Sequence, residues 1–308
     1  MTRFVLTSAL VVALVVGAAL TGVFAQGDTV KIGVIQPLSG PVAASGNYIR
    51  MGAEIGRDWI NAKGGVLGKK VELLIEDNKS DPKEAATAAE KLIVRDKVPV
   101  IIGAWGSSMT LAMMPLAAQH GVPLVVETSS SIKITDPKTP GQKVVSRISP
   151  TSELEAVGAG ALIPKLGMKK IGYLAVNTDW GRGAVVAFGD AFKKNGATVE
   201  AVEYVGQADT DFYAQLTKFK AAGVDSVVIT DDAPKAAKML QQMKELGLNA
   251  KVLITGGSAW PDSMALATTF TASNPRMPST TPIHGRPFFF HSSTYALLAS
   301  ASPAMFAS

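Results

Sequence analysis

The chain has 308 residues, of which 47% are hydrophobic and 18% charged, so it can form folded cores and is unlike a disordered chain. Its net charge of +5 is carried by scattered lysine pairs and not by one basic cluster, which argues against nucleic-acid binding. Cysteine is absent, which excludes disulfides, thiolate metal sites and a cysteine nucleophile. A chain of this length is typical of two domains.

The first 25 residues are typical of a secretory signal peptide. Arg3 precedes an apolar run over residues 4–20, and Val23, Phe24 and Ala25 form a small–x–small cleavage pattern. We expect cleavage after Ala25 and export of a soluble chain. A retained membrane anchor is the alternative, because the apolar run approaches the length that spans a bilayer. The small residues before the cleavage point favour a signal peptide.

Strand and helix patterns alternate from Val30 onward. Apolar β-branched runs predict strands, and apolar residues at helical spacing predict helices. The predicted strands are Val30–Gln36, 71–75, the run that begins at Val100, 124–127 and 144–148, and the predicted helices are 47–61, 82–95 and Ser107–Gln119. Strand–helix–strand units at this spacing predict a mainly parallel sheet that is covered by helices on both faces.

A second alternating set follows Ser149 and Pro150, which we expect to form a hinge, since proline fixes one backbone dihedral. Thr151 or Ser152 can cap the next helix. The predicted strands are 171–176, Thr198–Val205, Ser226–Thr230 and 252–255, and the predicted helices are Ser152–Leu166, 181–195, 212–222 and 234–246. The predicted fold class is therefore α/β, with two doubly wound parallel-sheet lobes at residues 28–148 and 151–264. In such sheets ligands bind at the carboxyl ends of the strands.

The alternating pattern stops near Ala265. Residues 265–308 are rich in Ser, Thr, Pro and Ala and show no sustained helical or strand period. We expect an atypical, disordered tail that leaves lobe 2 incomplete. A truncated or frame-shifted product is the hypothesis that accounts for it.

The sequence offers little for catalysis. No glycine-rich dinucleotide fingerprint and no G-x-S-x-G elbow follows a predicted strand, and the histidines are His120, His284 and His291. His120 ends a predicted helix, where a surface role is favoured. No His and carboxylate pair has metal-ligand spacing. We expect a binding protein without cofactor or metal, and an α/β enzyme is the weaker alternative.

Polar and aromatic residues follow several of the predicted strands. Trp105, Gly106 and Ser107 connect one strand to a helix start, where unpaired N–H groups and the helix dipole favour an anion such as a carboxylate. Ser107 then either caps this helix or binds a ligand. The same two alternatives apply to the other strand ends, which carry Thr128, Ser129, Ser130, Trp180, Asp231 and Asp232.

These motifs together resemble the branched-chain amino-acid-binding proteins, which are type I periplasmic binding proteins that serve ABC importers. The resemblance extends from about residue 30 to 258 and rests on the motifs PLSGP at 37–41, INAKGG at 60–65, GAWGSS at 103–108, WGRG at 180–183 and DF at 211–212, with Asp77 and DPK at 81–83. It implies a periplasmic, monomeric receptor that binds an amino acid, closes about its hinge and delivers the solute to a membrane permease.

The resemblance also implies a set of ligand-binding residues. Hydroxyls and backbone N–H groups of lobe 1 hold the ligand carboxylate in this family, and the matching positions are Ser107, Thr128 and Ser130, which Gly106 and Ser129 adjoin. Trp105 falls on a position whose backbone lines the pocket. From lobe 2, Trp180 matches an aromatic residue that covers the ligand, and Asp232 matches a contact to its ammonium group.

One departure leaves the ligand open. A second ammonium contact in the family, often an acid, falls on Gly257. A buried ammonium without a carboxylate is costly, so Asp232 must supply that partner if the ligand is an amino acid, which we favour. If Asp232 instead caps the helix at Pro234, the ligand is an aromatic carboxylate or a short amide. A sensory receptor of the same fold is a further alternative.

Overall fold

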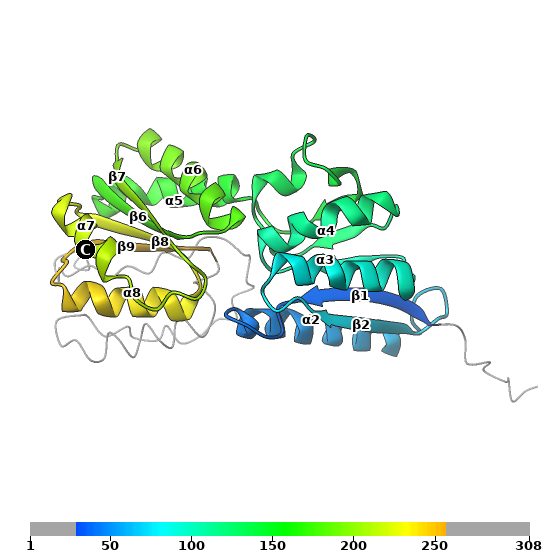
Figure 1. Cartoon of the computed structure of the whole chain (residues 1–308). Coiled ribbons are helices and arrows are strands. Elements are labelled where there is room, and N and C mark those ends of the chain that lie inside the picture. The colour runs from blue at the N-terminus through cyan, green and yellow to red at the C-terminus, as the bar shows by residue number, and fades with distance from the viewer. Residues whose placement is uncertain (1–28, 257–308) are drawn as a thin grey trace, which may run out of the picture.

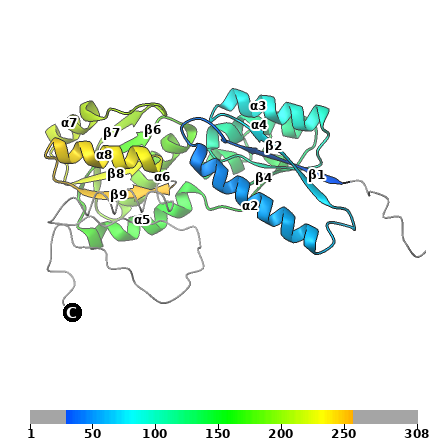
Figure 2. The same cartoon turned by 90° about the horizontal axis from the view of Figure 1, so that it is seen from below.

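The computed structural model describes residues 29–256, and these residues form two α/β lobes that lie side by side (Figures 1 and 2). The predicted signal peptide, Gly257 and the predicted tail at 265–308 lie outside the described residues. Within residues 29–256, no helix is both long and apolar enough to cross a membrane. The two lobes confirm the predicted α/β class with parallel sheets.

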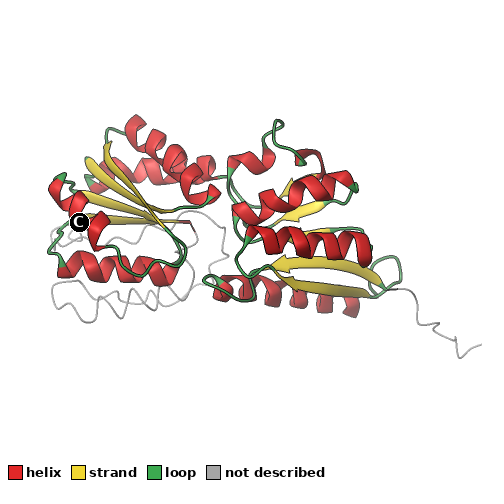
Figure 3. Cartoon of the chain, in the orientation of Figure 1, coloured by secondary structure: helices red, strands yellow, loops and turns green. Residues whose placement is uncertain are grey.

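Lobe 1 contains a five-stranded parallel sheet in the order β2-β1-β3-β4-β5. Figure 3 shows strands in yellow and helices in red in both lobes. The strands are β1 (Val30–Gln36), β2 (Val71–Asp77), β3 (Ile101–Gly103), β4 (Leu124–Val126) and β5 (Val145–Arg147). The helices are α2 (Ala43–Ala62), α3 (Pro82–Glu90) and α4 (Ser107–Gln119). Single turns at Lys91–Arg95, Ile132–Thr135 and Gln142–Val144 complete the lobe.

The two faces of the lobe 1 sheet are covered unequally. Helices α3 and α4 pack on one face over a continuous core that includes Ile35, Leu92 and Met113. Among residues 29–256, α2 is the helix that covers the other face, and its one buried residue is Gly46 (Figure 2). The side chains of Met51, Ile55 and Trp59, spaced four residues apart along α2, are exposed.

Lobe 2 contains a four-stranded parallel sheet in the order β7-β6-β8-β9. The strands are β6 (Lys170–Val176), β7 (Thr198–Val205), β8 (Ser226–Thr230) and β9 (Lys251–Thr255), and the helices are α5 (Ser152–Leu166), α6 (Asp179–Lys194), α7 (Tyr213–Ala221) and α8 (Ala233–Glu245). Side chains of β8 alternate between two cores. Val227 and Ile229 pack with α7 and α8, whereas Val228 packs with α5 and α6. Both faces are therefore covered, as the continuous apolar runs predict.

Capping residues set several helix starts. Asp81 accepts from the backbone N–H groups of Lys83 and Glu84 and caps α3, with Pro82 at its first position. Thr151 caps α5 by accepting from Leu154 N. Ser107 is not a helix cap: the N-cap of α4 is Gly106, and Ser107 is the first helical residue. This excludes one of the two interpretations of Ser107.

Within residues 29–256 the chain crosses from lobe 1 to lobe 2 once, between Arg147 and Ser152. The crossing contains Ser149 and Pro150, the predicted hinge. Ser152 N donates to the carbonyl of Ser130 at 2.9 Å, which joins the first turn of α5 to the loop after β4. The carboxyl ends of both sheets point toward the boundary between the two lobes (Figure 1).

Candidate functional site

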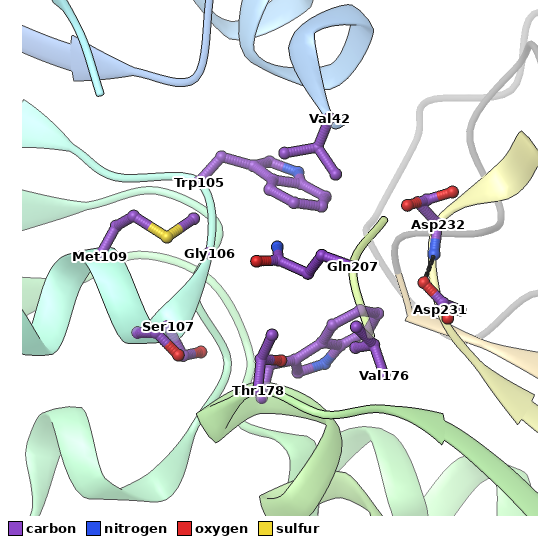
Figure 4. Close-up of a pocket in the computed structure, with 12 residues that line it drawn as sticks. Val42, Trp105, Gly106, Ser107, Met109, Val176, Thr178, Gln207, Asp231 and Asp232 are labelled. Carbon is purple, nitrogen blue, oxygen red and sulfur yellow. Dashed lines mark hydrogen bonds between the residues drawn. The ribbon is translucent and has the colours of Figure 1, made fainter. Parts of the chain in front are cut away.

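A pocket lies between the two lobes (Figure 4), and its empty space, part of which is open to solvent, is about 380 Å³. All of its lining residues lie at strand ends, in the loops that follow strands, or in the first turns of helices. Lobe 1 contributes Val42, Trp105, Gly106, Ser107, Ser108 and Met109, and lobe 2 contributes Val176, Thr178, Trp180, Gln207, Asp231 and Asp232. This is the location that a pair of facing parallel sheets favours for a ligand.

The loop between β3 and α4 is held from below by a buried glutamine. Trp105 N donates to Gln36 Oε1 at 3.0 Å, and Gln36 Nε2 donates to Glu127 Oε1 at 2.8 Å. Burial raises the pKa of Glu127 to about 7, although the hydrogen bond from Gln36 opposes the rise. The indole of Trp105 lines the pocket. Its Nε1 is buried and has no partner among residues 29–256.

The first turn of α4 presents donors to the pocket. Ser107 is 1% exposed, and its Oγ accepts the N–H of Ser131 at 3.2 Å. Since that contact uses an oxygen lone pair, the hydroxyl proton of Ser107 remains available for an acceptor. The first N–H groups of a helix have no partner within the helix. This wall of the pocket therefore suits a carboxylate.

The serines after β4 lie behind the pocket wall. Ser129 Oγ donates to the carbonyl of Ala104 at 2.7 Å and lies 2.9 Å from Thr110 Oγ1. Ser130 Oγ lies 3.1 Å from Ser152 Oγ, at the crossing between the lobes. Thr128, Ser129 and Ser130 are not among the residues that line the pocket. Ser129 and Ser130 brace the Trp105 loop and the crossing, respectively.

Trp180 lines the pocket from the first turn of α6. Thr178 caps this helix by accepting from Gly181 N at 3.3 Å. Gly256, with φ of +67°, lies against the indole, and a Cβ at this position would be 2.4 Å from Trp180 Cζ2. Any residue larger than glycine at position 256 would therefore clash with the indole of Trp180 in this position.

The two aspartates after β8 are both engaged within lobe 2. Asp231 Oδ2 lies 2.9 Å from Lys235 Nζ, and Asp232 Oδ1 accepts from Lys235 N at 3.1 Å as the cap of α8. Burial raises the pKa of Asp231 to about 7 despite the attraction of Lys235, and burial also raises the pKa of Asp232. Asp232 therefore caps helix α8 and also lines the pocket, so capping a helix and facing a ligand are compatible roles for this residue.

Five of the eight predicted site residues line the pocket: Trp105, Gly106, Ser107, Trp180 and Asp232. Sequence reasoning missed several others, most notably Ser108 and Gln207. Gln207 stands two residues after β7. The position of polar residues just after a strand, which identified the other candidates, could also have identified Gln207.

Ser108 connects the two lobes at the pocket. Its Oγ donates to Asp179 Oδ2 at 3.0 Å and accepts from Asp179 N at 3.1 Å. Lys133 Nζ of lobe 1 lies 2.9 Å from Asp179 Oδ1. Burial raises the pKa of Asp179, but the hydrogen bonds from Lys133 and Ser108 outweigh it, and the net pKa lies below its ordinary value. We call Ser108, Lys133 and Asp179 the cross-lobe latch.

The described part of the chain contains no group of three or more His, Cys, Asp or Glu side chains that could hold a metal ion. The polar groups around the pocket are hydroxyls, amides, an indole N–H and two aspartates. This set can bind and orient a small polar solute.

A model of the family described as periplasmic binding protein matches residues 29–281, most of the chain. The chain belongs to the periplasmic binding protein family. Among its relatives is the Leu/Ile/Val-binding protein BraC3 of Rhizobium johnstonii, which is 29% identical over 78% of this chain and 64% of its own length.

Solved structures of periplasmic binding proteins share the fold of this family member. The leucine-binding protein LivK of Thermotoga maritima has a TM-score of 0.69 and 30% identity, over 77% of this chain and 66% of that one. A solute-binding protein of an ABC transporter from Rhodopseudomonas palustris, in complex with 4-hydroxybenzoate, has a TM-score of 0.68 and 28% identity, over 77% and 65%. The present chain spans 60–64% of the length of the first curated relatives that it matches.

Proposed function

We propose that this protein is an extracytoplasmic receptor that binds a small carboxylate solute between its lobes and delivers it to the permease of an ABC importer. The observation that carries the proposal is the first turn of α4, where Ser107 keeps a hydroxyl proton available beside unpaired helix N–H groups in the pocket. Family membership and the chain's similarity to named solute receptors support it. Export by cleavage after Ala25 and action as a monomer belong to the same proposal.

An amino acid is the first candidate ligand. Asp232 lines the pocket opposite the α4 terminus and offers a carboxylate to an ammonium group. Similarity to proteins named for leucine, isoleucine and valine supports this choice.

An aromatic carboxylate is the second candidate, favoured by a specific observation. The indoles of Trp105 and Trp180 line the pocket from opposite lobes, and such faces suit a planar ring. A similar solved structure holds 4-hydroxybenzoate.

A thermal-shift screen of the residue 26–308 chain with amino acids, aromatic acids and short amides tests the proposal, followed by calorimetry on any hit. We expect saturable binding of a carboxylate and no shift with its methyl ester or amide. A screen in which only uncharged solutes bind, or in which a hit is chemically converted, contradicts the proposal.

The carboxylate contact has its own test in Ser107→Ala. We expect the variant to lose roughly 1–3 kcal/mol of binding free energy for the carboxylate hit, since one partner of a charged group is removed. Ser146→Ala, at an exposed position on β5, is the matched control and should bind as the parent does. Unchanged affinity in Ser107→Ala would assign Ser107 to bracing the Ser131 backbone alone.

A further inference from the structure

Gln207 is a polar side chain of lobe 2 that projects into the pocket. It lies in the loop after β7, and Figure 4 shows its amide pointing toward Gly106 on the opposite wall, with Trp105 above it and Thr178 below it. The residue is partly buried. Within residues 29–256 its amide makes no hydrogen bond, whereas the nearby Asp231 and Asp232 are both engaged with Lys235.

Hydrogen bonds of the preceding residue, Gly206, hold the backbone of the loop that carries Gln207. The carbonyl of Gly206 accepts from Lys235 Nζ at 2.9 Å, and the N–H of Gly206 donates to Asp209 Oδ2 at 2.7 Å. Lys235 in turn pairs with Asp231. The loop is therefore held in place before a ligand arrives, while the amide at its tip is left with its donors and acceptor unused. A fixed support for an unpaired polar group is the arrangement that favours selective hydrogen bonding to a ligand.

The other polar groups on this side of the pocket limit the kind of ligand group that can bind beside Gln207. Asp231 is paired with Lys235, and Asp232 is occupied in part by the cap of α8. Trp105 Nε1 is a second buried, neutral donor without a partner in the described part of the chain. Away from the first turn of α4, the groups that remain free to bind a ligand are therefore mainly uncharged, namely the Gln207 amide and the Trp105 indole N–H.

We propose that Gln207 determines specificity by hydrogen-bonding a neutral polar group, a hydroxyl or an amide, at the end of the ligand remote from its carboxylate. This inference rests on the proposed function, because it places the carboxylate at the first turn of α4. It adds that a solute with a purely apolar remote end leaves the amide of Gln207 buried without a partner, which lowers its affinity.

Two ligand pairs that differ in one remote polar group test this role. The pairs are 4-hydroxybenzoate with benzoate, and glutamine with norleucine, each measured by calorimetry on the parent and on Gln207→Leu. For one pair we expect the parent to prefer the polar member by about tenfold, the ratio that one hydrogen bond supplies. The pair that shows this preference identifies whether the solute is an aromatic acid or an amino acid.

In Gln207→Leu we expect this ratio to fall to within about twofold, through weaker binding of the polar member alone. Gln241→Leu, on the exposed side of α8, is the matched control and should keep the ratio of the parent. Melting temperatures without ligand should agree among the three proteins, which separates recognition from folding.

The failures of the two proposals are distinguishable. Equal affinity of the parent for both members of each pair that binds, or an unchanged ratio in Gln207→Leu, overturns the role of Gln207 and leaves the carboxylate receptor in place. A parent that binds none of the four probes and no other carboxylate overturns the proposed function together with this inference.

Discussion

Gly106 holds the pocket wall in a backbone conformation that other residues rarely adopt. Its φ is +100°, and a Cβ there would lie 2.2 Å from Cε of Met109. The methionine end is flexible and can move, but the positive φ cannot be relieved without turning the peptide that orients Trp105. One glycine therefore determines both the direction of the indole and the start of α4.

Gly106→Ala tests this dependence. We expect a loss of stability of about 1–3 kcal/mol, the usual cost of a strained backbone, together with weaker ligand binding. Urea unfolding and calorimetry measure the two effects. Gly52→Ala in α2, where an added Cβ meets nothing within 4 Å, should be neutral or slightly stabilising. Equal unfolding midpoints for the two variants would contradict this account of Gly106.

Helices α4 and α6 meet across the cleft through their first turns. Ser108 belongs to α4 and Asp179 to α6, and Lys133 from the turn after β4 completes the latch. The contact joins lobes that are otherwise connected within the described residues by the crossing at 148–151. The latch therefore biases the arrangement in which both walls of the pocket face each other.

Lys133→Met is expected to weaken ligand binding by about two- to fivefold at low salt, because a partly exposed ion pair contributes little more than that. The difference from the parent should disappear near 1 M NaCl, where exposed charges are screened. Lys138→Met, also exposed and in the segment after the same turn, is the control and should behave as the parent does. A defect in Lys133→Met that persists at high salt would contradict an electrostatic latch.

The element boundaries were predictable where caps and glycines act locally. Ser107–Gln119 and Ser152–Leu166 are confirmed in full, because a strand end, a turn and an apolar helical run follow one another within a few residues. Helix α2 starts four residues earlier than predicted, at Ala43, since the residues after Pro41 carry no cap signal. Thr128, Ser129 and Ser130 follow a strand just as Trp105 does, yet they do not line the pocket. Whether such a residue faces the pocket or supports its wall depends on contacts with residues far away in the sequence. Ser129 contacts Ala104 and Ser130 contacts Ser152, and sequence spacing does not encode these contacts.

Among residues 29–256, three carboxyl groups that are wholly or largely buried couple folding to pH. Burial raises the pKa values of Glu127, Glu155 and Asp231 to about 7. The folded chain therefore keeps these protons at pH values where the unfolded chain has released them. Their contribution to stability is complete below the unfolded pKa values, near 4, and is lost as the pH rises toward 7.

Glu127→Gln isolates one of these three sites. For the parent we expect the free energy of unfolding to fall between pH 5 and pH 7.5, as measured by urea titration. The free energy of unfolding of the variant should fall by roughly 2–3 kcal/mol less over the same pH range. Each pKa unit corresponds to about 1.4 kcal/mol, and glutamine carries no titrating proton. A parallel decline in parent and variant would show that Glu127 does not keep its proton in the folded chain.

The pocket and the cores use almost separate sets of residues. Of the twelve residues that line the pocket, Met109 alone also belongs to a hydrophobic core cluster of the described chain. Substitutions at the partly exposed pocket positions, such as Thr178 and Gln207, can therefore accumulate without a large loss of packing energy. Solved structures of a leucine-binding protein and of a solute-binding protein in complex with 4-hydroxybenzoate share this scaffold, so the same fold accommodates different ligands. The separation of pocket and core also makes the chain a suitable starting point for biosensors directed at other small solutes.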